Sequence, residues 1–161
     1  MVKIITLLLI YVNLLLATNY NFTETRYSDA LNKKINFEGT ISFTKDTIKI
    51  KYPKEKKSLK LKNNNLTYTE DGDEVKLEDT QTQKIIQYFK ILILIHNSNK
   101  DEIQNIFTTT NNGNKSILIP TTSLSNYIKK VELIKKENEL KQIQLFLQNN
   151  DYIMINIHDE I

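Results

Sequence analysis

Apolar and polar residues alternate along most of this sequence, and the two-residue period is typical of β-strands with one buried and one exposed face. In residues 48–52 three apolar side chains alternate with two lysines, and residues 59–62 continue the pattern. Residues 63–65 are asparagines and residues 71–73 form an acidic turn that leads into a short strand at 75–77; both have the composition of hairpin connections. We therefore predict a continuous meander of about ten or eleven antiparallel strands.

Residues 80–95 break the alternation and have the period of an amphipathic helix. The apolar stripe of this helix consists of Ile85, Ile86, Phe89, Leu92 and Ile93. The last five residues of the segment favour strands, so an earlier end to the helix stays open. A short helical turn is also expected at residues 123–126.

One helix and one long meander restrict the architecture, because the apolar face of a sheet cannot stay bare in water. The helix must cover that face. The predicted fold class is mainly β (α+β): a curved antiparallel sheet forming an unclosed half-barrel, with a helical lid over an apolar cavity.

The N-terminal residues 1–17 have the layout of a secretory signal peptide, with a lysine followed by an apolar run. This run is shorter than the roughly 20 apolar residues that cross a bilayer, which favours export over a retained anchor. We expect cleavage near Ala17. Residues 18–161 then suffice for one domain.

Charge and cysteine content narrow the possible partners. The formal net charge is +3 and the lysines are spread along the strands, whereas nucleic-acid binding favours a concentrated basic face, so we expect no nucleic-acid partner. The chain has no cysteine, which excludes disulfides and lipid attachment through a cysteine. We expect a soluble monomer. The lysine-rich outer strand faces are interpreted as solvated surface, with docking to anionic lipid head groups as the alternative.

Few residues suggest catalysis. His96 and His158 are the only histidines and are both expected at the surface, so no metal site is predicted. Glu24 and Asp29 are candidates for a pair of catalytic carboxylates, but alternating exposed strand positions explain them equally well. The sequence also contains no nucleophile elbow and no phosphate-binding glycine loop. We predict that the protein is not an enzyme and needs no cofactor.

The apolar sheet face has two interpretations. A stripe of Ile, Leu, Tyr and Phe is more often plain core than ligand pocket. Here about ten strands share one short helix as cover, so part of the face is expected to stay open as a cavity. Because each buried methylene contributes about 0.8 kcal/mol, such a cavity would hold acyl chains.

The order of these motifs resembles that of the LolA-type outer-membrane lipoprotein carriers and LolA-related periplasmic proteins. Residues 22–26 (Phe-Thr-Glu-Thr-Arg) look like the family's first-strand motif of Phe, Glu or Gln, and Arg at alternate positions. The further matching segments are 31–35, 39–43, 48–53, 59–65, 66–69, 106–107, 117–120, 128–133 and 140–143. The resemblance implies an unclosed barrel with a helical lid, a periplasmic location, and transfer of lipoprotein acyl chains from an inner-membrane transporter to an outer-membrane acceptor without a covalent step.

The resemblance also implies roles for particular residues. Ile86, Phe89 and Ile93 would close the cavity. Lys45 takes the place of the arginine that ties the lid down in the carriers. The residues that would line the cavity are Ile48, Ile50, Tyr52, Leu59, Leu61, Leu66 and Tyr68. The alternative function is a non-catalytic interaction or structural module of the cell envelope, in which the same face is fully packed.

Overall fold

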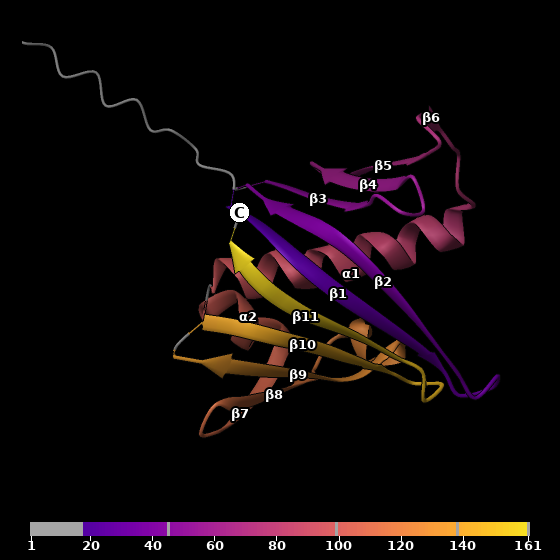
Figure 1. Cartoon of the computed structure of the whole chain (residues 1–161). Helices are drawn as coiled ribbons and strands as arrows, with labels where there is room; N and C mark the ends of the chain where they lie inside the picture. The colour runs from indigo at the N-terminus through magenta and orange to yellow at the C-terminus, as the bar shows by residue number, and fades with distance from the viewer. Residues whose placement is uncertain (1–17, 45, 99, 138, 161) are drawn as a thin grey trace, which may run out of the picture.

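The computed structural model describes residues 18–160 except 45, 99 and 138 (Figure 1). The predicted signal peptide therefore lies outside the described residues. The described chain forms one antiparallel sheet of eleven strands that does not close on itself, with two α-helices. The strands are β1 (Thr18–Ser28), β2 (Lys33–Phe43), β3 (Thr47–Tyr52), β4 (Lys57–Lys62), β5 (Asn65–Glu70), β6 (Asp73–Glu74), β7 (Phe107–Asn112), β8 (Lys115–Pro120), β9 (Ile128–Lys136), β10 (Glu139–Leu147) and β11 (Tyr152–Glu160).

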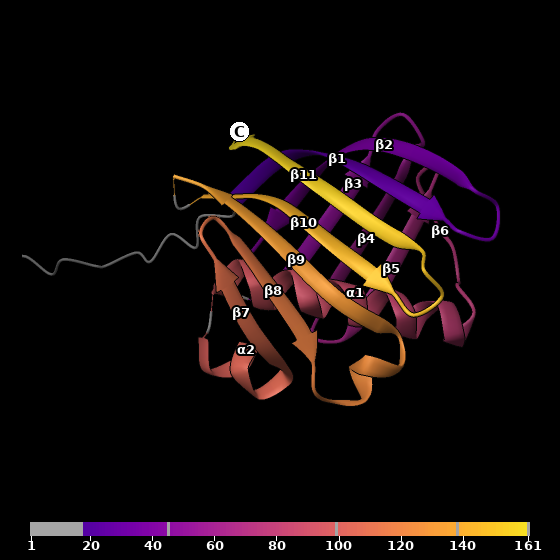
Figure 2. The same cartoon turned by 90° about the horizontal axis from the view of Figure 1, so that it is seen from below.

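The strand order is β6-β5-β4-β3-β2-β1-β11-β10-β9-β8-β7. Strands that are neighbours in the sheet are also consecutive in sequence, except at the centre, where the first and last strands pair. Because β6 and β7 form opposite edges, the chain between them must cross one face of the sheet. The helices α1 (Asp79–Asn97) and α2 (Lys100–Ile106) make this connection, and α1 runs across the inner face (Figures 1 and 2).

The hairpin turns follow from local backbone chemistry. Asn63 and Asn64 between β4 and β5 both have positive φ, at 50° and 65°, which asparagine tolerates better than most residues. Val75, by contrast, lies beyond the strand: β6 contains only Asp73–Glu74, so the predicted strand at residues 75–77 is wrong.

The core lies between the inner face of the sheet and α1. Phe22, Ile50 and Leu92, from β1, β3 and α1, are each 2% exposed or less. Gly39 on β2 lies directly opposite Phe22. A Cβ atom there would meet two Phe22 ring carbons at 2.8 and 2.9 Å and the carbonyl oxygen of Lys51, so only glycine lets the phenyl ring lie this close to the strand.

The helix α1 continues to Asn97 and does not end at the β-prone residues 91–95. Four of those five residues are buried, and α1 contacts both β3 of the sheet and α2. Burial on several sides overrides a weak local preference for strand. Ser98 ends the helix in the left-handed conformation, with its backbone N–H donating to the carbonyl of Ile95. The predicted helical turn is confirmed as a 3₁₀ helix, η1 (Ser123–Asn126), whereas α2 was not predicted.

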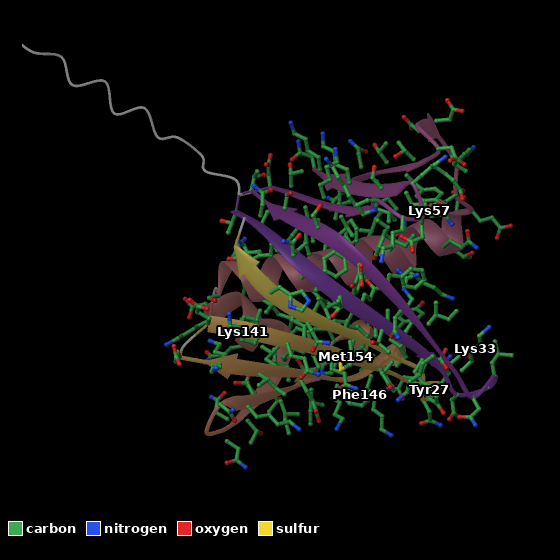
Figure 3. All side chains as sticks on the ribbon, viewed as in Figure 1. Tyr27, Lys33, Lys57, Lys141, Phe146 and Met154 are labelled. Atoms are coloured by element: carbon green, nitrogen blue, oxygen red, sulfur yellow. The ribbon has the colours of Figure 1, made fainter. Side chains whose placement is uncertain are left out.

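The outer face of β1, β11 and β10 carries a small aromatic row (Figure 3). The rings of Tyr27 and Tyr152 stack with centroids 5.1 Å apart, and Phe146 lies 6.2 Å from Tyr152. The Lys130 ammonium sits 4.4 Å from the Phe146 ring. These three rings are half-buried. They form a small apolar cluster on the outer face, separate from the core.

Candidate ligand-binding site

Most of the residues predicted to line a cavity meet on the inner face of the sheet. Ile48, Ile50, Tyr52 and Leu61 are buried there, and Leu59 and Leu66 are partly buried against them. From α1, Ile86 and Phe89 are buried and Ile93 is partly buried. Tyr68 is half-buried on β5, with its hydroxyl donating to Glu70. Lys45, the predicted lid contact, lies outside the described residues.

These residues pack against one another. Ile48, Ile50 and Leu92 are 0% exposed and Phe89 is 1% exposed, so helix side chains fill the space over β3. The inner face below α1 is thus a packed layer at this position.

An apolar groove lies further along the same helix. It has a volume of about 380 Å³ and runs between α1, α2, the start of β7 and η1. Its apolar lining consists of Ile91, Ile93, Leu94, Ile106, Phe107 and Leu124. Tyr127, at its rim, is 59% exposed. Of the residues predicted for the cavity, Ile93 alone contributes to this groove.

The groove depends on α2, which has little signal in the sequence. Its seven residues carry only Ile103 and Ile106 as apolar side chains, and neither is fully buried. The spacing of three residues between Ile103 and Ile106 is the only sequence signal that could have predicted this helix.

A polar cluster is embedded in the apolar inner face. Glu24 is 0% exposed, although its place in the sequence predicts an exposed strand position. Its neighbours across the sheet are Phe37 on β2 and Ile155 on β11. The alternation itself requires this placement, because Phe22 points inward and Glu24 is two residues further along the same strand.

Two side chains satisfy the Glu24 carboxylate. The Arg26 Nε donates to Glu24 Oε1, and the Tyr52 hydroxyl donates to Oε2 at 2.8 Å. Arg26 Nη2 also donates to the Tyr52 oxygen at 3.2 Å, which closes a three-membered network. The guanidinium lies 4.8 Å from the Phe37 ring centroid. Both oxygens of the buried carboxylate therefore have a hydrogen-bond partner.

The pKa values within the cluster follow from burial and charge. Burial opposes the charged form of Arg26, but the Glu24 carboxylate outweighs it and holds the Arg26 pKa above its ordinary value. Burial, followed by the Glu24 charge, raises the pKa of Tyr52 well above its usual range. Both groups therefore keep their protons at neutral pH.

Tyr88 brings α1 to the same cluster. Its hydroxyl is buried, and burial followed by the Glu24 charge raises the Tyr88 pKa well above its ordinary value. The hydroxyl makes no hydrogen bond of acceptable geometry within the described part of the chain. A buried polar group without a partner costs about 1–3 kcal/mol.

We expect the two tyrosines to respond differently to loss of the hydroxyl. Tyr52→Phe removes hydrogen bonds to two charged groups and should lower the free energy of unfolding by about 1.5–3 kcal/mol. Tyr88→Phe removes an unpaired hydroxyl and should leave that free energy unchanged or raise it by up to about 1 kcal/mol. Urea unfolding of both variants beside the parent protein measures the difference; equal losses would mean that the Tyr88 hydroxyl has a bonded partner.

His96 also departs from its prediction. It is half-buried near the end of α1, and its ring stacks on Phe43 with centroids 4.0 Å apart while Tyr20 meets it edge-on. Burial lowers its pKa, which favours the neutral ring that stacks well. His158 is exposed as predicted.

The described residues bring no three metal-binding side chains of the His, Cys, Asp or Glu type together. Of the helices in the described ranges, none combines the length and apolar character that a membrane-spanning helix needs. In the comparisons with known proteins, no family model and no curated protein sequence matches the chain.

Proposed function

We propose that this protein is a carrier that binds acyl chains of lipoproteins or other lipids and delivers them to the outer membrane. The observation that carries the proposal is the apolar groove beside α1. Its volume of about 380 Å³ lies at the lower end of the range of small-ligand sites, about 300–1,000 Å³. The apolar part of its lining is aliphatic and aromatic, which suits a hydrocarbon chain.

The energetics of burial suit reversible transport. Each methylene removed from water contributes about 0.8 kcal/mol, so about ten buried methylenes give about 8 kcal/mol before the cost of ordering the chain. The net affinity is then strong enough for capture and weak enough for release. The mechanism we propose is binding and hand-over without a covalent step.

In this proposal α1 acts as a lid. The helix crosses the inner face between the two sheet edges, and the groove lies along one side of it. An acyl chain that enters the groove would push α1 away from the packed side chains over β3. The LolA-like motif order supports this reading, together with export to the periplasm, an inner-membrane donor and an outer-membrane acceptor. The unclosed antiparallel sheet is compatible with it.

A pair of tryptophan substitutions in η1 tests the groove. Ser123 lines it, whereas Ser125, two residues away and also exposed, does not. We expect Ser123→Trp to weaken binding of a fluorescent fatty acid by at least about ten-fold, because the indole occupies the groove, and Ser125→Trp to bind as the parent does. Equal binding by all three proteins would place the acyl chain elsewhere.

Native mass spectrometry of the purified protein, with extraction of any lipid that co-purifies, tests the proposal more broadly. A bound lipid or acylated peptide supports the carrier function and gives the class of cargo. An unliganded mass that does not change on addition of diacyl and triacyl lipopeptides contradicts it.

A second candidate function is a cell-envelope interaction module. It is favoured by the complete packing of Ile48, Ile50 and Phe89 beneath α1, which leaves no open space over β3. A partner would then add a strand to the edge formed by β7, whose exposed residues 108–112 are threonines and asparagines. Binding of a protein partner that is lost when β7 carries a proline, without any lipid binding, would favour this function.

A further inference from the structure

Four lysines share one patch on the outer face of the sheet. Lys49 and Lys51 alternate with buried residues on β3, and Lys60 and Lys62 do the same on β4, so all four point away from α1. Lys49 and Lys60 are direct cross-strand partners. Figure 2 shows β3, β4 and β5 side by side towards one end of the sheet. We call these four residues the lysine patch.

Among the described residues, the cross-strand partners of the patch lysines include no acidic side chain. The cross-strand neighbours of these lysines are otherwise hydroxyl or amide residues: Thr40, Ser42, Thr47, Ser58, Asn65 and Thr67. None of the four lysines forms an ion pair with a described residue.

Three acidic residues near the patch pair with other lysines. Glu38 pairs with Lys54 at 2.6 Å, Glu70 with Lys57 at 3.1 Å and Asp71 with Lys56 at 3.4 Å. Lys57, the first residue of β4, is labelled in Figure 3. Asp46, just before β3, accepts hydrogen bonds from the Thr44 and Thr47 hydroxyls. None of these four carboxylates forms an ion pair with a patch lysine.

Protection of a sheet edge does not explain this arrangement. Proteins place lysines on edge strands to block unwanted strand pairing, but β3 and β4 are interior strands, and the edge on this side is formed by β5 and β6. Like charges directly opposite one another on a sheet also destabilise it. An anionic partner bound to this face would offset the repulsion between Lys49 and Lys60.

A shallow depression on the patch has the chemistry of an anion site. It has a volume of about 220 Å³ and is lined by Lys60, Lys62, Asn63, Asn65 and Thr67. Ammonium, amide and hydroxyl groups of this kind all donate hydrogen bonds, and lysine is a common phosphate binder.

We propose that the lysine patch docks the protein on the anionic phospholipid head groups of a bilayer surface. The patch offers neither the arginines and aromatic rings that recognise nucleic acids nor the apolar anchors that dominate protein interfaces. The four ammonium groups are spread over two strands, so each can contact a different phosphate in a layer of mobile lipid head groups. The inference does not depend on acyl-chain binding, because it concerns the opposite face of the sheet.

Vesicle co-sedimentation of the full chain tests the docking. The patch variant replaces Lys49, Lys51, Lys60 and Lys62 by glutamine; the control variant replaces Lys84, Lys129, Lys135 and Lys136, which are exposed and lie outside the patch. Both variants lose four positive charges, and both keep residues 1–17 unchanged. The vesicles contain either equal parts of phosphatidylglycerol and phosphatidylethanolamine, or phosphatidylcholine alone.

Each lysine close to an anionic surface contributes about five-fold to binding, so we expect the patch variant to bind the anionic vesicles at least about fifty-fold more weakly than the parent. The control variant should lose less than about five-fold, and high salt should weaken the parent's binding. Equal losses in both variants, or binding that is independent of phosphatidylglycerol, overturn the proposal. So does binding of the patch to duplex DNA or an acidic protein without binding to vesicles. The fatty-acid assay with the patch variant separates this test from that of the groove, because its acyl affinity should be unchanged.

Discussion

Replacing Arg26 with methionine is expected to lower the free energy of unfolding by about 2–4 kcal/mol. Methionine keeps part of the apolar contact with the Phe37 and Tyr52 rings but removes the positive charge beside Glu24. The wholly buried carboxylate then has no charged partner. We place the loss below the largest values for buried pairs because the Arg26 side chain is 48% exposed, so solvent partly screens the pair.

A double variant identifies the cause. Arg26→Met with Glu24→Gln lacks both the guanidinium and the carboxylate, so no charge is buried without a partner. Removing both partners of a buried pair costs less than removing one of them. We therefore expect the double variant to have a higher free energy of unfolding than Arg26→Met.

An exposed ion pair provides the matched control. Lys54 Nζ lies 2.6 Å from Glu38 Oε2, and both side chains are largely exposed. Lys54→Met should therefore change the free energy of unfolding little. Urea unfolding followed by circular dichroism measures all of these variants. A similar loss for Arg26→Met and Lys54→Met, or a double variant no more stable than Arg26→Met, would show that the unpaired Glu24 carboxylate does not cause the loss.

The sheet was predictable because its signals are local. Alternation determines which side chains of a strand share a face, and the asparagines at 63 and 64 supply the positive φ that their hairpin needs. The pairing of β1 with β11 has no such signal, because it joins the two ends of the chain. The continuation of α1 to Asn97 was also not predictable, since it depends on burial of residues 91–95 by distant elements.

The candidate site was predictable in part for the same reason. Ile48, Ile50 and Phe89 follow local periods, and they are found on the expected inner face. Glu24 was misplaced because a charged residue was assumed to be exposed, although the period of its own strand points it inward. Its partner Tyr52 lies 28 residues away, so the network that makes burial tolerable is a tertiary contact. The groove needed α2 and η1, whose positions only the folded chain determines.

Replacing Phe89 with alanine is expected to lower the free energy of unfolding by about 3–5 kcal/mol. The phenyl ring is 1% exposed in the layer between α1 and the sheet, so truncation loses its burial and leaves a cavity. Lys84→Ala, on the exposed side of the same helix, is the control and should change the stability little. Urea unfolding measures both. A small loss for Phe89→Ala would mean that the layer collapses around the missing ring.

Hydrogen exchange on Phe89→Ala separates the two candidate functions. If α1 acts as a lid, the missing ring should let the helix open as a unit, so that its amides exchange faster than those of β1 and β11. The emptied space then joins the acyl-binding side of the sheet, and the variant should bind the fluorescent fatty acid at least as tightly as the parent. In a packed interaction module α1 belongs to the same cooperative unit as the sheet. Amides of α1, β1 and β11 would then accelerate together, and no fatty acid would bind to either protein.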